Sequence, residues 1–544
     1  MPNTSRHLDH TRHLDHTRRR ARTLAAVSLA GILMLASRSG TGAQAPQGAP
    51  ADLLVRNGRV IDGTGSPARA ADIAITGDRI TFVGDAGRAN VTARRTIDAR
   101  GLIVAPGFID PHTHALEDLN SSDARRRANL NFLMQGVTTV LTGNDGGGPF
   151  EVARTLEQWK TRGIGTNAVL FVGYGSVRRT VMGMSDARPS PAQLDSMRAL
   201  VDKAMREGAI GMSAGLYYAP QNYGTTEEVI ELAKVAARHG GLYDTHMRDE
   251  SSYTIGLLGA IREAIRIGRE ANLPVNISHL KALGVDVWGR SDSAIAIIEA
   301  ARGSGQKVTA DQYPYTASGS SVGASLLPRW AEVGGGDSLR ARVADPTTRA
   351  RLVADMTENL RRRGGPESLL MTSTRDTSIL GKTLAQVAAA RGVSPVEAAI
   401  QIILNGGSSV ASFNMNEKDI EAFMRRPWVM TGSDGSGGHP RKYGTFPKKW
   451  AEYVREKKVL TPEAFVRQSS SLAAETFGLE DRGVIARGKF ADVVVFDEAT
   501  FRDRATYQKP TELATGMRYV IVNGKVVVDS GAFANITPGV GITR

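Results

Sequence analysis

The chain has no cysteine among its 544 residues. This absence excludes disulfide bonds and thiolate metal ligands, so a metal site would have to use histidine nitrogens and carboxylate oxygens. A chain of this length can still bury a core large enough to be stable without disulfides. We expect one large α/β domain with a smaller accessory domain, because α/β barrels alone often exceed about 200 residues.

The apolar run near the N-terminus, residues 23–36, is shorter than the roughly 20 residues of a membrane-spanning helix. A basic segment, residues 17–22, precedes it, and Ala43 and Ala45 follow with the small-residue spacing of a cleavage site. We therefore predict that residues 1–45 are a cleavable export signal. The mature protein is then periplasmic or secreted, without a stable membrane anchor, and the paired arginines leave Sec and twin-arginine routes both open.

Basic residues are not concentrated into a patch that would favour nucleic acid. The densest basic stretch after the leader, residues 339–365, also contains acidic and apolar residues at helical spacing, which predicts a solvated helix face. Removal of residues 1–45 takes away seven arginines and two aspartates, so the formal charge falls from +13 to +8. This moderate positive charge is compatible with an anionic small-molecule substrate or with solubility alone.

Short segments of alternating polarity lie at both ends of the mature chain. They fill residues 51–105 and reappear at residues 483–497 and 516–531. In the last of these, Asn523 and Gly524 have the sequence of a two-residue hairpin turn. We predict that residues 51–105 and 480–540 together form a small β-sandwich domain.

Between these ends, short apolar segments alternate with helical stretches, a pattern typical of parallel βα units. Eight such strands are expected, at residues 107–114, 136–145, 167–176, 208–216, 241–250, 274–281, 307–315 and 428–435. Eight is the number that closes a (β/α)8 TIM barrel, which we assign to residues 106–479. Helix start signals support the pattern, with Thr225 followed by Glu228, and Thr461 followed by Pro462. The long crossover at about 320–425 predicts an inserted helical subdomain over the barrel mouth.

Histidines are few, and most of them follow the expected strands. Four of the ten lie in the export signal. Of the remaining six, His239 falls in the last turn of a helix, where a structural role is expected from the helix dipole. The other five end a strand or lie in the loop beyond it, which is where barrel enzymes carry their catalytic groups: His112, His114, His246, His279 and His439.

A metal site is the simplest reason for several histidines to meet at one end of a barrel. His112 and His114 are two residues apart on a strand, so their side chains point the same way. A single strand-end histidine is more often structural, but four from three strands, joined by Asp434, indicate a shared ligand. Imidazole and carboxylate together suit zinc and similar divalent ions. We predict one or two Zn²⁺ ions, with other divalent metals as alternatives, bound by His112, His114, His246, His279 and Asp434.

These motifs resemble the amidohydrolase superfamily and, within it, the N-acyl-D-amino-acid deacylase (D-aminoacylase) family. The resemblance covers nearly all of the mature chain. It is carried by PGFIDPHTH, THMRDE, NISHLKALG, GSDG and the loop HPRKYGTFP at residues 439–447. It implies a metal-dependent amidohydrolase whose substrate site is lined by Lys281, by Tyr313 or Tyr315, and by Arg441. A guanidinium suits the free carboxylate of an amino acid, because it can donate two parallel hydrogen bonds.

The sequence departs from this family at one position. The family has a cysteine after the second strand in a Gly-Asn-Cys-Gly motif, whereas this chain has GNDG with Asp145 there. Asp145 can serve as an oxygen ligand, even a bridging one, or it can simply cap a turn. The fourth strand, residues 208–216, has no lysine, so a carboxylated-lysine bridge is not expected.

The expected activity is hydrolysis of the amide bond of N-acyl amino acids, in particular N-acyl-D-amino acids, or of dipeptides. A metal-activated hydroxide would attack, and Asp434 would move the proton from the water to the departing amine. Two alternatives remain open. One is hydrolysis of a cyclic amide, a lactone or another ester at the same centre, and the other is a catalytically inactive periplasmic metal-binding protein. Chirality cannot be deduced from sequence, because mirror-image substrates can use the same arginine and metal.

Overall fold

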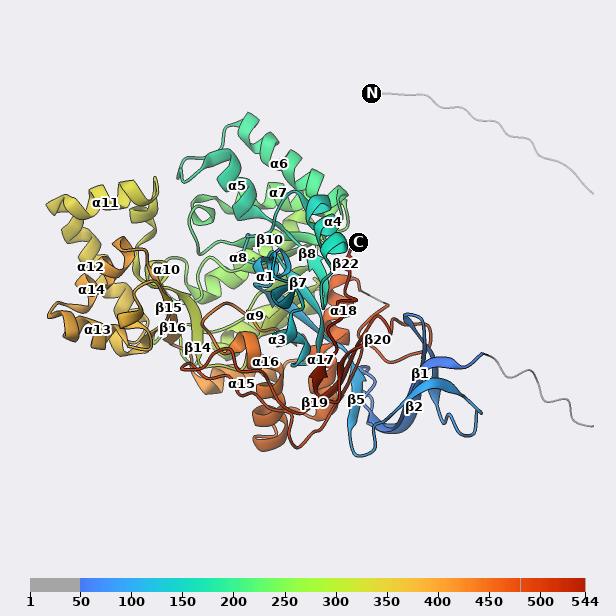
Figure 1. The fold of residues 1–544 in the computed structure, drawn as a ribbon. Helices are drawn as coiled ribbons and strands as arrows, with labels where there is room; N and C mark the ends of the chain where they lie inside the picture. The colour runs from blue at the N-terminus through green and yellow to red at the C-terminus, as the bar shows by residue number, and fades with distance from the viewer. Residues whose placement is uncertain (1–48, 480, 544) are drawn as a thin grey trace, which may run out of the picture. The chain divides into compact units, whose positions relative to one another are not determined.

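The structure is a computed structural model that describes residues 49–479 and 481–543 (Figure 1). The expected export signal, residues 1–45, lies outside these residues. From Pro50 onward the chain forms one compact unit of mixed α/β structure. All eight segments that the sequence predicts as strands of the central region contain strands in this structure.

These central strands are parallel and belong to two sheets. The first contains β6 (Phe108–Thr113), β7 (Val137–Thr142) and β8 (Asn167–Leu170), with β22 (Gly541–Ile542) added beside β8. The second runs in the order β17 (Val429–Thr431), β13 (Val308–Gln312), β12 (Val275–Ile277), β11 (Leu242–His246), β10 (Gly211–Gly215) and β9 (Val172–Gly173). Apart from β22, every residue of these strands except Thr309 is buried, as expected for strands that are covered on both faces.

The two parallel sheets approach each other at both of their edges. At one edge, β8 and β9 follow each other in the chain with only Phe171 between them. At the other edge, Thr113 at the end of β6 forms a parallel bridge with Gly435, just beyond β17. The backbone N–H of Asp434 also donates to the carbonyl of His112 over 2.9 Å. The carboxyl ends of all these strands therefore face the same side of the molecule.

Helices follow the strands and begin where the sequence signals place them. Thr225 caps the helix after it by accepting from the N–H of Glu228, and Thr461 caps another by accepting from Ala464, with Pro462 at its first position. The helices of this region are α1 (Leu116–Leu119), α2 (Ala124–Arg127), α3 (Leu130–Leu133), α4 (Val152–Arg162), α5 (Tyr174–Met182), α6 (Pro191–Arg206), α7 (Thr226–Arg238), α8 (Gly256–Ala271), α9 (Ser291–Gly303), α15 (Glu417–Met424), α16 (Arg441–Lys448), the π-helix η5 (Lys449–Glu456), α17 (Pro462–Ser469) and α18 (Ser471–Phe477).

Strands from the two ends of the described chain share one nine-stranded sheet. The N-terminal part supplies β1 (Ala51–Val60), β2 (Arg69–Thr76), β3 (Arg79–Gly84), β4 (Ala93–Asp98) and β5 (Ile103–Pro106). The C-terminal part supplies β18 (Val493–Phe496), β19 (Met517–Val522), β20 (Lys525–Asp529) and β21 (Ala532–Phe533). The antiparallel pair β5 and β18 joins the two parts. The turn between β19 and β20 is the expected Asn523–Gly524 hairpin, with φ of 48° and 76°.

The segment between β13 and β17 contains a sheet that the sequence did not indicate. Its helices are α10 (Val322–Leu326), α11 (Gly336–Ala344), α12 (Pro346–Arg362), α13 (Leu384–Arg391) and α14 (Pro395–Leu404), at the left of Figure 1. Three antiparallel strands accompany them in the order β14 (Ala317–Ser321), β16 (Ser408–Phe413) and β15 (Leu369–Thr374). This insertion has an apolar core of its own, separate from the core around the parallel strands.

One arginine that follows helix α12 departs from the expected pattern of surface charge. The sequence predicts a solvated basic face over residues 339–365, but Arg363, directly after this helix, is only 2% exposed.

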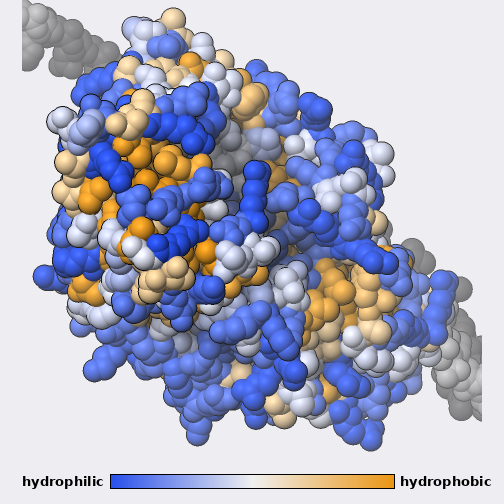
Figure 2. Space-filling view, turned by 60° about the vertical axis from the view of Figure 1, so that its left-hand side comes forward, coloured by the Kyte–Doolittle hydropathy of each residue, from blue (hydrophilic) through white to orange (hydrophobic). Residues whose placement is uncertain are grey.

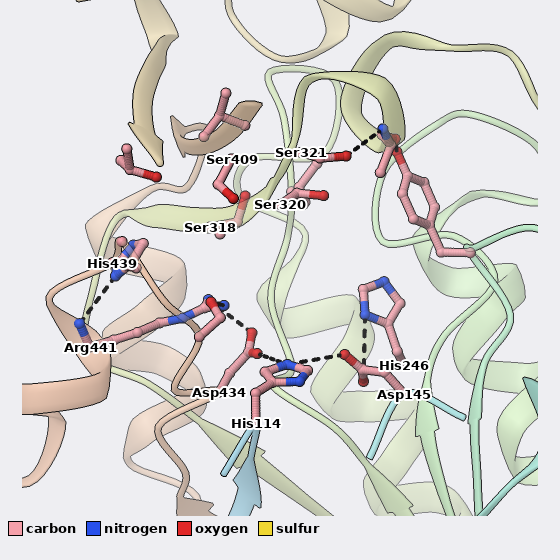
Figure 3. Close-up of a pocket in the computed structure, with 18 of the residues that line it drawn as sticks. His114, Asp145, His246, Ser318, Ser320, Ser321, Ser409, Asp434, His439 and Arg441 are labelled. Carbon is pink, nitrogen blue, oxygen red and sulfur yellow. Dashed lines mark hydrogen bonds and ion pairs between the residues drawn. The ribbon is translucent and has the colours of Figure 1, made fainter. Parts of the chain in front are cut away.

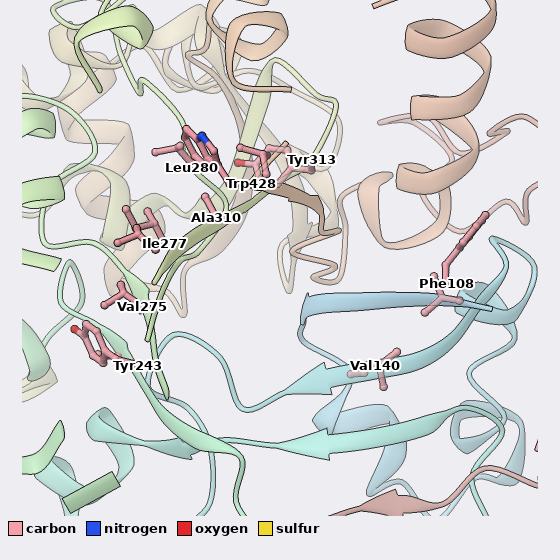
Figure 4. Close-up of a cluster of buried hydrophobic side chains, with 14 of the residues drawn as sticks. Phe108, Val140, Tyr243, Val275, Ile277, Leu280, Ala310, Tyr313 and Trp428 are labelled. Carbon is pink, nitrogen blue, oxygen red and sulfur yellow. The ribbon is translucent and has the colours of Figure 1, made fainter. Parts of the chain in front are cut away.

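The largest apolar core packs around the parallel strands, where Val275, Ile277 and Ala310 lie side by side with Trp428 (Figure 4). Figure 2 shows a mostly hydrophilic face with hydrophobic residues gathered in patches. Among residues 49–479 and 481–543, no single helix is long and apolar enough to cross a membrane, and only the bent pair α13 and α14 meets those criteria jointly, by length and composition.

Candidate metal centre and substrate pocket

Six side chains that the sequence proposed as metal ligands converge at the carboxyl ends of the parallel strands. Their potential ligand atoms form two groups, within each of which all atoms lie inside 4.8 Å. The first group is His112, His114, Asp145 and Asp434, and the second is Asp145, His246 and His279. Because Asp145 belongs to both groups, its carboxylate occupies the position of a bridge between two adjacent sites (Figure 3).

Asp145 has the backbone of a turn residue but directs its side chain into the cluster. Its φ of 56° is left-handed, as an Asn-Asp-Gly turn allows. One carboxylate oxygen lies 3.4 Å from His112 Nε2 and 3.5 Å from His279 Nε2, and the other lies 3.6 Å from His114 Nε2. His246 Nδ1 is 3.9 Å from the first oxygen. The turn itself is closed by backbone atoms, since Gly147 N donates to Asn144 O.

Strained backbone accompanies three members of this cluster. Besides Asp145, His279 has φ of 36° and Asp434 has φ of 47°. Non-glycine residues adopt this region uncommonly, at a cost of about 1–3 kcal/mol, and such residues concentrate at functional sites. The packing around the strand ends therefore holds these three side chains in the cluster against a local conformational cost.

The unpaired polar atoms of the cluster fit a divalent metal ion. Both ring nitrogens of His112, Nδ1 of His246 and Oδ1 of Asp145 are buried and have no hydrogen-bond partner. Buried polar atoms nearly always have a partner, so several unpaired atoms in one place indicate a missing ligand. Neutral imidazole nitrogens and carboxylate oxygens are the donors that zinc prefers. The residues present thus match the chemistry of a metal centre with two neighbouring ions.

A layer of buried carboxylates fixes the backbone beneath the cluster. Asp110 accepts from the N–H groups of His112 and Ser433, at 3.2 and 3.0 Å. Asp311 accepts from the N–H of His279 at 2.9 Å. Burial raises the pKa of Asp110 to about 7. The sequence analysis did not predict a role for these two aspartates. Asp110 lies two residues before His112, and Asp311 lies near the end of β13, so both positions face inwards.

The charged groups of the cluster perturb one another strongly. Burial alone would raise the pKa of Asp434, but Arg441, His279 and other neighbouring cations lower it by more than burial raises it. The pKa of Asp434 therefore lies well below its usual range. Burial lowers the pKa of His246 to about 4, which keeps its imidazole neutral and able to bind a metal. Asp434 is therefore a carboxylate and His246 a neutral base at neutral pH.

A cavity of about 570 Å³ opens over the cluster. Arg441, Lys281 and Tyr313 line it, as expected. The guanidinium of Arg441 is 1% exposed, lies 2.8 Å from Asp434 Oδ2 and stacks over the ring of Tyr313 at 4.6 Å. Nε of Arg441 and the Tyr313 hydroxyl are buried without partners, so both have donors free for a ligand.

Tyr315 and His239 lie outside the cavity, whereas His439 lines it without joining the metal cluster. Tyr315 is not among the residues that line the cavity, and its ring packs edge-on against His439 at 5.4 Å. His439 is buried, with Nε2 3.1 Å from the carbonyl of Ala317 and Nδ1 accepting from the backbone of Arg441. His239 caps the end of α7 and contacts Asp202 over 2.8 Å. Neither histidine belongs to the metal cluster.

Other residues of the cavity were missed by the sequence analysis. Glu250 lies 2.6 Å from the ammonium of Lys281, and its carboxylate also approaches the rings of His279 and His246, at 3.1 and 3.6 Å. Its position four residues after His246, in the segment THMRDE, was an available signal. The far wall is formed by the insertion and nearby loops, with hydroxyl groups that gave no sequence signal: Tyr217, Tyr253, Ser318, Ser320, Ser321 and Ser409.

Comparison with known proteins agrees with this geometry. The family described as Amidohydrolase family matches residues 95–528. D-aminoacylase from Alcaligenes xylosoxydans xylosoxydans is 36% identical over 511 residues, which cover 89% of this chain and 96% of that protein. The crystal structure of N-acyl-D-glutamate deacylase from Bordetella bronchiseptica, in complex with zinc and a phosphonate that mimics the tetrahedral intermediate, has a TM-score of 0.78 at 30% identity. The alignment covers 91% of this chain and 100% of that deacylase. A structure of D-aminoacylase with a binuclear metal centre has the same coverage, with a TM-score of 0.78 and 33% identity.

Proposed function

Because this chain belongs to the amidohydrolase family, we propose that it is a metal-dependent hydrolase that cleaves the amide bond of N-acyl-D-amino acids. One observation carries the proposal: a cluster of four histidines and two aspartates shares a cavity with a buried arginine that has a free donor. The first feature suits hydrolysis and the second suits a substrate carboxylate. The relatives act on N-acyl-D-amino acids by name, which supports the D configuration.

The proposed scaffold is a closed (β/α)8 barrel over residues 106–479. The bridge between Thr113 and Gly435 and the direct succession of β8 and β9 support closure, since they bring together the free edges of the two parallel sheets. The proposal retains the small β-sandwich domain of residues 51–105 and 480–540, whose strands share the nine-stranded sheet. The insertion at about 320–425 would cover the mouth of the barrel.

The proposed cofactor is Zn²⁺, one ion or two, held by His112, His114, Asp145, His246, His279 and Asp434. A D-aminoacylase at 33% identity has a binuclear metal centre, and the deacylase from Bordetella bronchiseptica binds zinc. Such an ion supplies Lewis acidity, which lowers the pKa of water and polarises a carbonyl. The carboxylate of Asp145 takes the place of the cysteine that the deacylase family has at this position.

Asp434 is the proposed proton carrier. Its lowered pKa keeps it ionised at neutral pH, so it can accept the proton of the attacking water. Oδ1 of Asp434 lies 3.0 Å from His114 Nε2 inside the cluster, whereas Oδ2 contacts Arg441 at the edge of the substrate cavity. A carboxylate in this position can reach both the water and the leaving amine, and return the proton to the amine.

Arg441 and Tyr313 are the proposed binding groups for the carboxylate of the substrate. Nε of Arg441 and the Tyr313 hydroxyl are both buried without partners, and the stacking of one group on the other keeps them together. Lys281 adds positive charge to the same cavity, although its ammonium is also bound by Glu250. Tyr315 does not line the cavity and would influence the substrate only indirectly, by packing against His439. The free carboxylate of an N-acyl amino acid is therefore held beside Asp434.

Purified protein assayed with paired N-acetyl-D- and N-acetyl-L-amino acids tests this proposal. We expect release of the free D-amino acid, loss of this activity after treatment with a chelator, and recovery on addition of Zn²⁺. Elemental analysis should find one or two metal ions per chain. Cleavage of cyclic amides or lactones but not of acyclic amides would favour the alternative hydrolase, and bound metal without turnover would favour an inactive binding protein.

We also propose that the protein is exported. The support is the order of basic segment, apolar run and Ala43–Ala45 within residues 1–45. N-terminal sequencing of the protein from a periplasmic fraction should give a chain that begins at Pro46. A mature protein that retains the leader, or that stays in the cytoplasm, would contradict export.

A further inference from the structure

Arg363 is a buried cation that has no acidic partner in the part of the chain that the structure describes. Its side chain is 2% exposed, directly after α12 of the insertion. It donates only to neutral oxygens, namely the carbonyl of Ser325 at 3.2 Å, the hydroxyls of Ser412 and Tyr217 at 3.4 and 3.1 Å, and the side-chain oxygen of Asn414 at 3.2 Å in the favoured orientation of its amide. No aspartate or glutamate among residues 49–479 and 481–543 forms an ion pair with it.

The other buried arginines show that this is exceptional. Four arginines are buried in the described part of the chain: Arg178, Arg363, Arg441 and Arg482. Arg178 pairs with Glu228 at 3.1 Å, Arg441 with Asp434 at 2.8 Å, and Arg482 with Asp492. Removing a charge from water is costly unless it is paired, so proteins bury arginine almost only beside a carboxylate. Arg363 alone lacks this compensation.

Arg363 lies in the wall of the cavity above the metal cluster. It lines the same cavity as His246, and Tyr217 connects the two. The ring of Tyr217 stacks on the imidazole of His246 with a centroid distance of 5.6 Å, and its hydroxyl accepts from Arg363. A missing anionic partner could thus be supplied by a molecule that occupies the cavity.

The surroundings of Arg363 are suited to an anion. The hydroxyl of Tyr253, also in the cavity wall, is buried without a partner. Figure 3 shows serine side chains across the cavity from Asp145 and His246: Ser318, Ser320, Ser321 and Ser409. The only aliphatic side chains in the wall are those of Leu283, Ala324 and Val410. A guanidinium has five donors, and the four contacts of Arg363 leave one of them available.

Two arginines in one cavity therefore suggest two carboxylates on one substrate. Arg441, beside Asp434, is assigned to the carboxylate of the amino acid. We propose that Arg363 binds a second carboxylate, so that the preferred substrate is an N-acyl amino acid with two negative charges. This inference rests on the proposed function. The second carboxylate would belong either to an acidic amino-acid side chain or to a dicarboxylic acyl group.

Two pairs of isosteric substrates distinguish these sources. N-acetyl-D-glutamate is compared with N-acetyl-D-glutamine, and N-succinyl-D-alanine with its succinamide analogue, by kcat/KM of the zinc-loaded enzyme. We expect the charged member of one pair to be preferred at least about tenfold, since a charge-assisted hydrogen bond is roughly twice as strong as a neutral one and a tenfold preference corresponds to about 1.4 kcal/mol. The pair that shows the preference identifies the source.

Arg363→Met should abolish this preference by lowering kcat/KM for the charged substrate about 100-fold while changing that for its neutral partner only a few-fold. Arg362→Met is the matched control, because Arg362 is the adjacent residue, is partly exposed and pairs with Glu358 at 3.4 Å. It should leave the preference unchanged. Arg363→Lys, which keeps the charge without the fork of donors, should reduce the preference but not remove it.

The outcomes separate this inference from the proposed function. Absence of hydrolysis of every N-acyl amino acid by the parent enzyme would refute both. Hydrolysis without a preference in either pair would refute only the role of Arg363. An equal loss on all four substrates in folded Arg363→Met would also refute this role. If Arg363→Met fails to fold, Arg363→Lys decides, and an unaltered preference in that variant would overturn the proposal.

Discussion

Lys281 and Glu250 form an ion pair of 2.6 Å in the wall of the cavity, and each side chain is only 4% exposed. Glu250 also lies 3.1 Å from Nδ1 of His279, whose other nitrogen faces Asp145. A carboxylate that accepts the Nδ1 proton leaves Nε2 free as a metal ligand, as in many carboxylate–histidine–metal arrangements. Lys281 Nζ lies 2.7 Å from the same Nδ1 and can only donate, so Glu250 and Lys281 compete for this nitrogen, and Glu250 favours the tautomer that binds metal through Nε2.

This relationship predicts unequal effects of two substitutions. Glu250→Gln should weaken metal binding by about 10–100-fold, because an amide is a poorer acceptor and can turn its NH₂ group towards His279. Lys281→Met should affect metal binding less, since the carboxylate remains. Metal per chain after dialysis against graded concentrations of chelator measures both. Equal retention of metal in the Glu250→Gln variant and the parent would rule out this role.

Substitutions of Asp145 test whether it bridges the two groups of ligands. Asp145→Ala should lower the metal content, because it removes the only side chain shared by both groups. Asp145→Cys should retain metal and shift the preference towards zinc over harder ions, since thiolate is softer than carboxylate. If Asp145 serves only the turn, Asp145→Asn should behave like the parent and metal content should be indifferent to all three changes. Elemental analysis of the dialysed variants distinguishes these cases.

Asp434→Asn should reduce turnover by roughly 100-fold or more, because an amide of the same shape cannot carry a proton. Most of the metal should remain, since the histidines and Asp145 still surround it. Steady-state turnover and metal content, measured on the same preparation, test this expectation. Turnover within a few-fold of the parent would exclude Asp434 as the proton carrier.

Lys449 should make stability depend on pH. It is fully buried at the start of η5, where its ammonium donates to Thr431 and Gln468, each over 3.0 Å. Burial lowers the pKa of Lys449 from 10.5 to about 7. The folded state then binds the proton less tightly than the unfolded state. The resulting penalty is complete below about pH 7, declines as the pH rises towards 10.5, and is absent above it.

Lys449→Met should therefore raise the free energy of unfolding by a few kcal/mol near neutral or lower pH, at about 1.4 kcal/mol for each unit of pKa difference, with a smaller gain at alkaline pH. The hydrogen bonds lost with the ammonium reduce the gain by a similar amount at each pH. Chemical denaturation of both proteins at about pH 6 and about pH 10 gives the comparison. A difference between variant and parent that does not change with pH would contradict the prediction.

The strands and the metal cluster could be predicted because their signals are local. A buried strand needs an apolar run, and a side chain at its end must face the same side as those of its parallel neighbours. His246 and His279 were recognised in this way. The hairpin at Asn523 and Gly524 was predictable for the same reason, since its positive φ angles restrict the choice of residue.

The walls of the cavity could not be predicted, because their residues acquire their environment only from packing between distant segments. Residues 317–321, with the sequence ASGSS, form β14 without any apolar alternation, since their partners lie on β16. Arg363 follows a helix whose charges are largely solvated, and its sequence gives no sign that α10 and β16 enclose it. Glu250 had a favourable position after His246, but its pairing with Lys281 joins the segments that follow two different strands, β11 and β12.

The sheet built from both ends of the chain has a consequence for synthesis of the protein. Pro106 of β5 is paired with Val493 of β18, so the edge of β5 stays open until the ribosome has made almost the whole chain. At roughly 5–20 residues per second, this takes tens of seconds. During that interval a row of unpaired backbone groups beside apolar side chains can associate with other nascent chains. Aggregation during expression should therefore begin at this open edge, and a chaperone that shields the first hundred residues should improve the yield more than one that acts on the finished chain.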